Sequence, residues 1–296
     1  MDKNSIGLIG FGEVAYVFAK ELTQKGITVY VYDHRFLEDS PKGRKKREKA
    51  EEIGVQQMHS VEQLVGCTPV ILSTVVPAAA YDVAKAASAI VDERHMFIDM
   101  NSVNPKVKQE MADLFPDGSL FLDGVIMGAP KIRGLETLIY YSGRCPLTDL
   151  NERSPALQHF HLRHVGPKIG DASAIKMCQS IFSKGLQSLI IEQILLTTKL
   201  GIHDIVEENL NRILGSRSYT DWVEYALRSN LMHAKRRSDE LQNAVELLSM
   251  EGLPARHSRA AQETLKWLAE LNMQEMTEND SIPIQDLIRA ILDRYK

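Results

Sequence analysis

The chain has 296 residues, of which 44% are hydrophobic and 25% charged, a balance typical of globular proteins rather than disordered or fibrous ones. Lysine and arginine number 35 and aspartate and glutamate 39, so the net charge of −4 argues against nucleic acid or an anionic membrane as a partner. The three cysteines lack C-x-x-C spacing, which predicts no disulfide framework and no zinc site and favours a reducing cytoplasm. The N-terminal apolar stretch is too short for a targeting segment, and the longest later apolar run is too polar to span a membrane. We therefore expect a cytoplasmic protein that holds no metal.

In the first half of the chain, short β-branched runs alternate with amphipathic segments. Strands are predicted at 5–10, 27–32, 70–75, 96–99, 119–123, 138–143 and 161–166. A helix is predicted over 13–25, because its apolar residues recur at helical spacing and Gly26 follows as a stop signal. Alternating strands and helices imply βαβ units and a mostly parallel, doubly wound sheet.

From Asp171 onward the apolar pattern is helical, and Asp171 itself is expected to cap the first of these helices. Breaks are predicted near Gly201, Gly215, 252–254 and 277–283. The sequence therefore predicts an α/β fold, with the sheet domain in residues 1–168 and an all-α domain in residues 169–296. The basic run 42–52 passes directly into glutamates, which favours a solvated helix face over a nucleic-acid patch.

A G-x-G-x-x-A motif joins the first predicted strand to the first helix, and it consists of Gly10, Phe11, Gly12, Glu13, Val14 and Ala15. Gly10 permits a tight turn, Gly12 lets the backbone approach a pyrophosphate, and the helix N-terminus faces the negative charge. Strand, helix and second strand follow in the order of a Rossmann dinucleotide-binding domain. The second strand ends at Asp33, whose carboxylate would accept hydrogen bonds from the adenosine ribose. Asp33 favours NAD because it would repel a 2′-phosphate, and Arg35 nearby leaves NADP possible.

These features resemble those of the superfamily of 6-phosphogluconate dehydrogenase and the β-hydroxyacid dehydrogenases, in a branch with a phosphogluconate dehydrogenase-like helical domain. The resemblance covers nearly the whole chain. Beyond the cofactor motif it rests on VILSTVVP (70–77), DMNSVNP (99–105), FLDGVIMGAP (121–130) and GDASAIKMCQS (170–180), which occur in the family's order and at similar spacing.

The resemblance implies roles for individual residues. Those implied to lie beneath the ribose nearest the nicotinamide are Thr74, Val75 and Val76. Those implied in catalysis are Lys176 as general acid–base, with Asn101 and Ser102 beside the nicotinamide or substrate. The small and apolar neighbours of Lys176 predict an enclosed helical turn. The alternatives are a solvated surface lysine, and a turn at Asn101 that only caps the next helix.

The substrate segment departs from the family's pattern. Serine-glycine-glycine of the better-known enzymes is replaced by Met127, Gly128 and Ala129, so a hydroxyl donor is lost although backbone N–H groups could still bind an acid. The asparagine that follows the catalytic lysine by four residues is replaced by Ser180. The resemblance therefore says less about the identity of the substrate than about the fold or the cofactor.

The leading hypothesis is an NAD(P)-dependent dehydrogenase that transfers a hydride between nicotinamide and the hydroxyl carbon of a small β-hydroxyacid or related acid. The alternatives are an aldehyde or keto-acid reductase of the same family and a catalytically silent dinucleotide-binding regulatory protein. An apolar stripe at Leu186, Leu189, Ile190, Ile194 and Leu195 predicts a homodimer formed through the helical domains.

Overall fold

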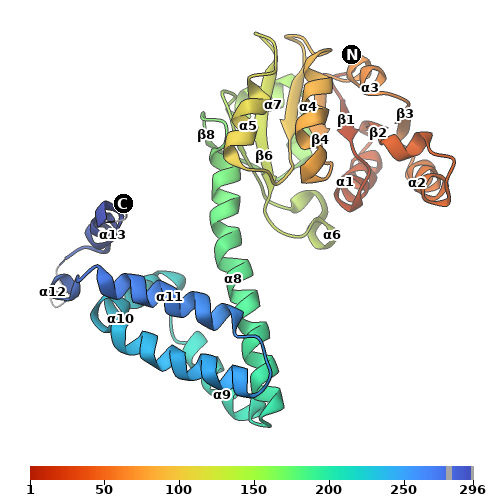
Figure 1. Cartoon of the computed structure of the whole chain (residues 1–296). Helices are drawn as coiled ribbons and strands as arrows, with labels where there is room; N and C mark the ends of the chain where they lie inside the picture. Colours follow the sequence, from red (N-terminus) through yellow and green to blue (C-terminus); the bar gives the residue numbers. More distant parts are fainter. Residues whose placement is uncertain (278–281, 295–296) are drawn as a thin grey trace. The chain divides into compact units, whose positions relative to one another are not determined.

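The computed structural model describes residues 1–277 and 282–294 of the chain (Figure 1). It divides into two compact units, Met1–Ile181 and Phe182–Lys296, and the division falls inside one long helix, α8 (Asp171–Lys199). The boundary predicted after residue 168 remains a prediction. Because α8 continues without interruption from the first unit into the second, no turn marks where one compact unit ends.

The first unit is built on one eight-stranded sheet with the order β3-β2-β1-β4-β5-β6-β7-β8. Its strands are β1 (Ser5–Ile9), β2 (Thr28–Tyr32), β3 (Gln56–Met58), β4 (Val70–Ser73), β5 (Met96–Asp99), β6 (Leu120–Ile126), β7 (Ile139–Ser142) and β8 (Leu162–Gly166). Only the β6–β7 pair in this sheet is antiparallel. The order reverses between β1 and β4, which is the topology of a doubly wound Rossmann sheet and confirms the predicted fold class.

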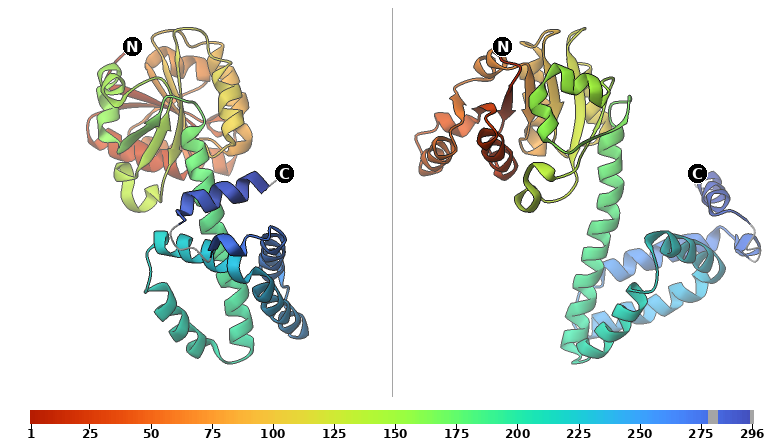
Figure 2. Two further views of the ribbon diagram at one scale, coloured as in Figure 1. Left: turned by 90° about the vertical axis from the view of Figure 1, so that its left-hand side faces the viewer. Right: turned by 180° about the vertical axis from the view of Figure 1, so that it is seen from behind.

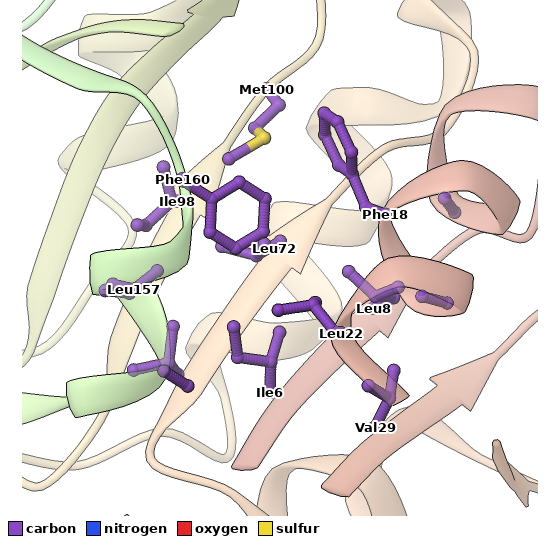
Figure 3. Close-up of a cluster of buried hydrophobic side chains, with 14 of the residues drawn as sticks. Ile6, Leu8, Phe18, Leu22, Val29, Leu72, Ile98, Met100, Leu157 and Phe160 are labelled. Atoms are coloured by element: carbon purple, nitrogen blue, oxygen red, sulfur yellow. The ribbon is translucent and has the colours of Figure 1, made fainter. Parts of the chain in front are cut away.

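Helices cover both faces of this sheet (Figure 2). They are α1 (Glu13–Gln24), α2 (Pro41–Glu52), α3 (Val61–Cys67), α4 (Ala80–Ser88), α5 (Pro105–Ala112), α6 (Pro130–Arg133) and α7 (Leu147–Arg153). Alternate strand residues enter two separate cores, because successive side chains of a strand point to opposite faces. On one face Phe18 of α1 meets Phe160, with ring centroids 5.2 Å apart (Figure 3). On the other face α3, α4 and α5 pack over residues such as Phe97.

The second unit contains the later part of α8 and further helices. These are α9 (His203–Leu214), α10 (Tyr219–Met250), α11 (Arg256–Glu270), α12 (Gln274–Thr277) and α13 (Ile284–Arg294). Helices α10 and α11 lie side by side and enclose a small core around Val245, Leu248 and Ala255. The predicted breaks near Gly201, Gly215 and 252–254 coincide with the helix ends, whereas residues 278–281 of the fourth break lie outside the described residues.

Candidate functional site

Two of the predicted cofactor segments meet at the end of β1. Gly10 has a φ of +91° and its N–H donates to the Tyr32 carbonyl at 2.8 Å. A Cβ at Gly10 would lie 2.9 Å from the Thr74 carbonyl oxygen and 2.9 Å from Cγ1 of Val75. Left-handed backbone and close approach both require glycine here. The structure thereby brings the motif after β1 against the segment after β4, and each of the two is predicted to contact the dinucleotide.

Gly12 differs from Gly10, because the space around it is open to solvent. It is exposed, a Cβ there would meet nothing within 4 Å, and it is the N-cap residue of α1 without a side-chain capping bond. The first amides of a helix carry partial positive charge and need acceptors. The start of α1 therefore fits a pyrophosphate, in agreement with the sequence motif.

Asp33 lies at the end of β2 with its side chain only 6% exposed. Its Oδ2 accepts from the Phe11 N–H at 2.7 Å, its Oδ1 accepts from the Arg35 N–H at 3.0 Å, and Lys46 forms an ion pair with it. Burial by itself raises the pKa of Asp33, but hydrogen bonds from Lys46 and from the two amides outweigh it, so the pKa lies below its usual value. The Asp33 charge is thus compensated inside the protein, which weakens the repulsion of a 2′-phosphate on which the preference for NAD was based.

A pocket of about 520 Å³ opens beside the start of α1. Phe11, Gly12 and Glu13 line it together with five lysines, namely Lys42, Lys45, Lys46, Lys49 and Lys131. Four of these lysines belong to α2, where the spacing i, i+3, i+4, i+7 places them on one face. The start of α2 lies close to the preceding turn at Glu38, and this requires glycine at position 43, because a Cβ there would lie 2.4 Å from the Glu38 carbonyl oxygen. The prediction of a merely solvated face is wrong for Lys46, whose side chain is 23% exposed and paired with Asp33.

The remaining predicted cofactor residues differ in their exposure, and of these only Glu13 lines the pocket. The Glu13 carboxylate is exposed and lies 3.9 Å from Nζ of Lys131. Val14 is half-buried and packs on the core, while Val76 is 65% exposed. The Arg35 side chain is half-buried, and its backbone N–H is the group that contacts Asp33.

The carboxyl ends of β4, β5 and β6 lie next to one another, and this edge carries the segments predicted to contact nicotinamide and substrate. Asn101 is 4% exposed, and its Nδ2 donates to Oγ of Ser73 at 3.0 Å and to Oδ1 of Asp99 at 2.6 Å. Ser102 is exposed. Asn101 therefore directs its amide nitrogen into the protein, which fixes the turn after β5.

The substrate segment follows β6 on the same edge of the sheet. The Met127 N–H donates to the Leu138 carbonyl at 2.8 Å, so this amide is already engaged. Gly128 and Ala129 are exposed, and Gly128 has a φ of +132°. An acid could thus reach the backbone at these two residues but not the Met127 amide.

Lys176 and Ser180 lie one turn apart in α8, and both side chains are half-buried. Ile175 is 39% exposed and Cys178 is also exposed, so the expectation of an enclosed turn is wrong for this chain by itself. The reason is that only the first residues of α8 pack against the sheet. Ala172 and Ser173, for example, are 0% and 1% exposed, and the Ser173 N–H donates to Asp123 of β6.

Sequence reasoning missed a row of buried polar side chains that crosses the sheet. The strand register aligns Ser73 of β4, Asp99 of β5, Asp123 of β6 and Ser142 of β7, and all four are fully buried. Lys108 of α5, also 0% exposed, lies above the row. Its Nζ is 2.7 Å from Oδ2 of Asp99 and 3.1 Å from Oδ1 of Asp123. The available signal was that both aspartates end or interrupt otherwise apolar strands.

Asp123 also holds the start of α8. Its Oδ2 accepts from the N–H groups of Gly170 at 3.1 Å and Ser173 at 3.0 Å, and its Oδ1 accepts from Oγ of Ser173 at 2.6 Å. Oγ of Ser142 donates to Asp123 as well. The cap for the first turn of α8 therefore comes from Asp123 in β6 rather than from the expected Asp171.

Within 1–277 and 282–294, histidine, cysteine and acidic side chains form no group of three or more suited to a metal ion. Across the same residues, none of the helices combines the length and the apolar character needed to cross a membrane.

Comparisons with known proteins agree with the fold. Residues 5–102 match the family described as NADP oxidoreductase, coenzyme F420-dependent, and residues 198–268 match a domain of unknown function, DUF1932. An uncharacterized 28.5 kDa protein from Methanothermus fervidus is 27% identical over 240 residues, which covers 80% of this chain and 87% of that protein.

Solved structures with a similar fold include proteins of unknown function and an imine reductase. A conserved hypothetical protein from Sinorhizobium meliloti is 29% identical with a TM-score of 0.59, covering 98% of this chain and 96% of its own. A conserved protein described as structurally similar to 3-hydroxyacid dehydrogenases is 29% identical with a TM-score of 0.57, covering 91% and 98%. An imine reductase from Myxococcus stipitatus in complex with NADP+ shares the fold at 17% identity, with a TM-score of 0.70 and coverage of 90% and 94%.

The chain thus has the fold of nicotinamide dinucleotide-dependent oxidoreductases. This fold agrees with the superfamily that the sequence motifs indicated, because one similar structure is described as resembling 3-hydroxyacid dehydrogenases, and residues 198–268 match DUF1932.

Proposed function

We propose that the protein is an NAD(P)-dependent dehydrogenase that acts on the hydroxyl carbon of a small β-hydroxyacid or related acid. The observation that carries the proposal is the uncapped start of α1 at Gly12, which opens beside a pocket lined by lysines. Bound there, the nicotinamide dinucleotide supplies the hydride acceptor or donor. The chain's own residues bind and orient the substrate and move its proton.

Lys176 is the proposed proton carrier. An amine in the early turns of α8, beside the carboxyl edge of β5 and β6, can accept a proton from a substrate hydroxyl or return one. The exposed backbone at Gly128 and Ala129 is the proposed acid-binding segment, with Ser180 one turn beyond Lys176 on the same helix. Ser102, exposed after β5, is proposed to contact the nicotinamide or substrate together with Asn101.

For the cofactor we propose NADP over NAD, although the Asp33 carboxylate alone favours NAD. Lys46 already compensates Asp33, and Lys42, Lys45 and Lys49 add positive charge around the same pocket. A 2′-phosphate bears about two negative charges and pairs well with ammonium groups. This charge balance supports NADP.

Calorimetric titration with NADP+ and NAD+ tests the cofactor proposal without a known substrate. The triple variant Lys42→Ser, Lys45→Ser, Lys49→Ser should lose at least about tenfold in NADP+ affinity, because charge-assisted phosphate contacts are lost, and should keep its NAD+ affinity. The control variant Lys20→Ser, Lys25→Ser, Lys85→Ser removes the same charge from exposed positions outside the pocket. Equal loss in both variants would indicate only a general charge effect and would contradict the proposal.

Turnover is tested with a panel of hydroxyacids, polyol acids, aldehydes and keto acids. Oxidation of a hydroxyacid supports the dehydrogenase. Turnover confined to aldehydes or keto acids would favour the reductase alternative. Tight dinucleotide binding with no turnover across the panel would favour the catalytically silent binding protein and refute the proposal.

We further propose that the protein forms a homodimer through its helical part. The apolar stripe predicted from the sequence is exposed in the chain by itself, including Leu189 at 43%, Ile190 at 49% and Leu195 at 51%. Apolar side chains gathered on one helix favour a protein partner, and a second copy is the commonest one. Analytical ultracentrifugation that gave a monomer at all concentrations would contradict this.

A further inference from the structure

The buried polar row contains more charge than packing needs. Lys108, Asp99 and Asp123 are all 0% exposed, so that one ammonium group lies between two carboxyl groups in the interior. Burying ionised groups is unfavourable unless they are paired, and well-packed apolar side chains of similar volume often stabilise a core as well or better. The ionic cluster is therefore poorly explained by stability alone.

The cluster joins two segments of the proposed site. At one end Asp99 accepts from Nδ2 of Asn101, which fixes the turn after β5. At the other end Asp123 accepts from the N–H and Oγ of Ser173, three residues before Lys176. Lys108 bridges the two carboxylates and also donates to the backbone carbonyls of Asp99 and Gly124.

We infer that Lys108, Asp99 and Asp123 are positioning residues that hold Asn101 and the Lys176-bearing turns of α8 at a fixed spacing. The inference rests on the proposed role of Lys176. The cluster suits this task because the hydrogen bonds of Lys108 to two backbone carbonyls and of Asp123 to Ser173 are directional and define one geometry, whereas apolar packing tolerates small shifts. Sub-ångström placement matters to a proton-transfer group, since small displacements lower the rate steeply.

Hydrogen–deuterium exchange of Asp123→Asn tests the anchoring. An amide at this position turns one acceptor into a donor that faces the Gly170 and Ser173 N–H groups or Lys108, so the first turn of α8 should loosen. We expect exchange in residues 170–176 to rise at least about tenfold, as for a local opening, while dinucleotide affinity is unchanged. Asp113→Asn, the same change at an exposed residue that ends α5, is the control and should leave exchange unchanged.

The positioning role is tested at Lys176 itself. Competitive labelling with acetic anhydride, read by mass spectrometry, compares Lys176 with the exposed Lys184 on the same helix. In Asp123→Asn the ratio of Lys176 to Lys184 labelling should rise at least threefold. Ser173→Ala removes only one hydroxyl donor, so it should raise the exchange and the labelling ratio by less than Asp123→Asn does. If Asp123→Asn does not fold, Ser173→Ala provides the test in its place.

The outcomes separate the inference from the proposed function. A folded variant with unchanged exchange at 170–176, or with an unchanged labelling ratio, overturns the positioning role. Failure of the wild-type protein to bind either dinucleotide refutes the proposed function instead, and the exchange and labelling results still decide whether the network places Lys176.

Discussion

Two regions of the first unit use lysine and aspartate in opposite ways. Beside Asp33, the lysines of α2 line an open pocket, and Lys45 and Lys49 are exposed there. Beneath Asn101, Lys108 is fully buried between two aspartates. An exposed charge is screened and keeps its capacity to bind a ligand, whereas a buried one is committed to its partners. The first region is therefore suited to bind a charged ligand, and the second is suited to fix the positions of the segments that it connects.

The largest expected effect contrasts the two regions directly. Lys108→Met leaves two buried carboxylates facing each other, and removing one partner of a buried ion pair costs about 3–5 kcal/mol. Lys45→Met at the exposed pocket should change the free energy of unfolding by no more than about 0.5 kcal/mol. Urea unfolding of both variants measures the difference. A loss below about 1 kcal/mol in Lys108→Met would remove the distinction between the regions.

The next effect concerns the helix that the buried region holds. Lys176→Ala should lower turnover at least about a hundredfold, because a positioned acid–base group contributes roughly 10²–10⁴ in rate. Dinucleotide affinity, measured by titration, should stay nearly the same. Lys176→Arg should restore little, because a guanidinium group does not release its proton near neutral pH. Near-normal turnover in Lys176→Ala would make this lysine a structural residue.

Two glycines of the cofactor motif sharpen the description of the open region. Gly12→Val should abolish dinucleotide binding with only a small fall in the melting temperature, because its Cβ enters open space where the pyrophosphate would lie and the only cost is a poorer N-cap residue. Gly10→Val should instead destabilise the fold by about 1–3 kcal/mol, because φ is positive and the Thr74 carbonyl is close. Thermal melts should therefore show the larger loss of stability in Gly10→Val, and binding titrations at a temperature where both variants are folded should show the loss of affinity in Gly12→Val. Equal losses of stability in both variants would contradict the different roles assigned to the two glycines.

The smallest effect is the pH dependence of the Asp33 contacts. The pKa of Asp33 is lowered in the folded protein, so its contribution to stability is fully present above its unfolded pKa of about 3.9 and is lost as pH falls through the folded value. The advantage of the wild type over Asp33→Asn should therefore be constant from pH 7 to pH 5 and shrink below about pH 4. Unfolding at pH 7, 5 and 3 measures it. An advantage that grew on acidification would contradict the direction of the pKa.

Local patterns predicted most of the first unit. Seven of the strands lie within a few residues of their predicted ranges, and α1 ends one residue before the predicted limit. The strand that was missed, β3, is the three-residue segment Gln56–Met58, too short and too polar for a periodic signal. The meeting of Gly10 with Thr74 and Val75 agrees with the predicted doubly wound sheet, because that topology places these turns together.

By itself, then, the sequence determined the alternation of strands and helices and the dinucleotide motif, because each depends on residues close together in the chain. The tertiary structure decided that Lys46 compensates Asp33 and that α2 turns its lysines toward the pocket. It alone placed Asp99 and Asp123 in one row beneath Lys108. Those contacts join separate strands and helices, and only the register of the sheet brings such distant side chains within bonding distance.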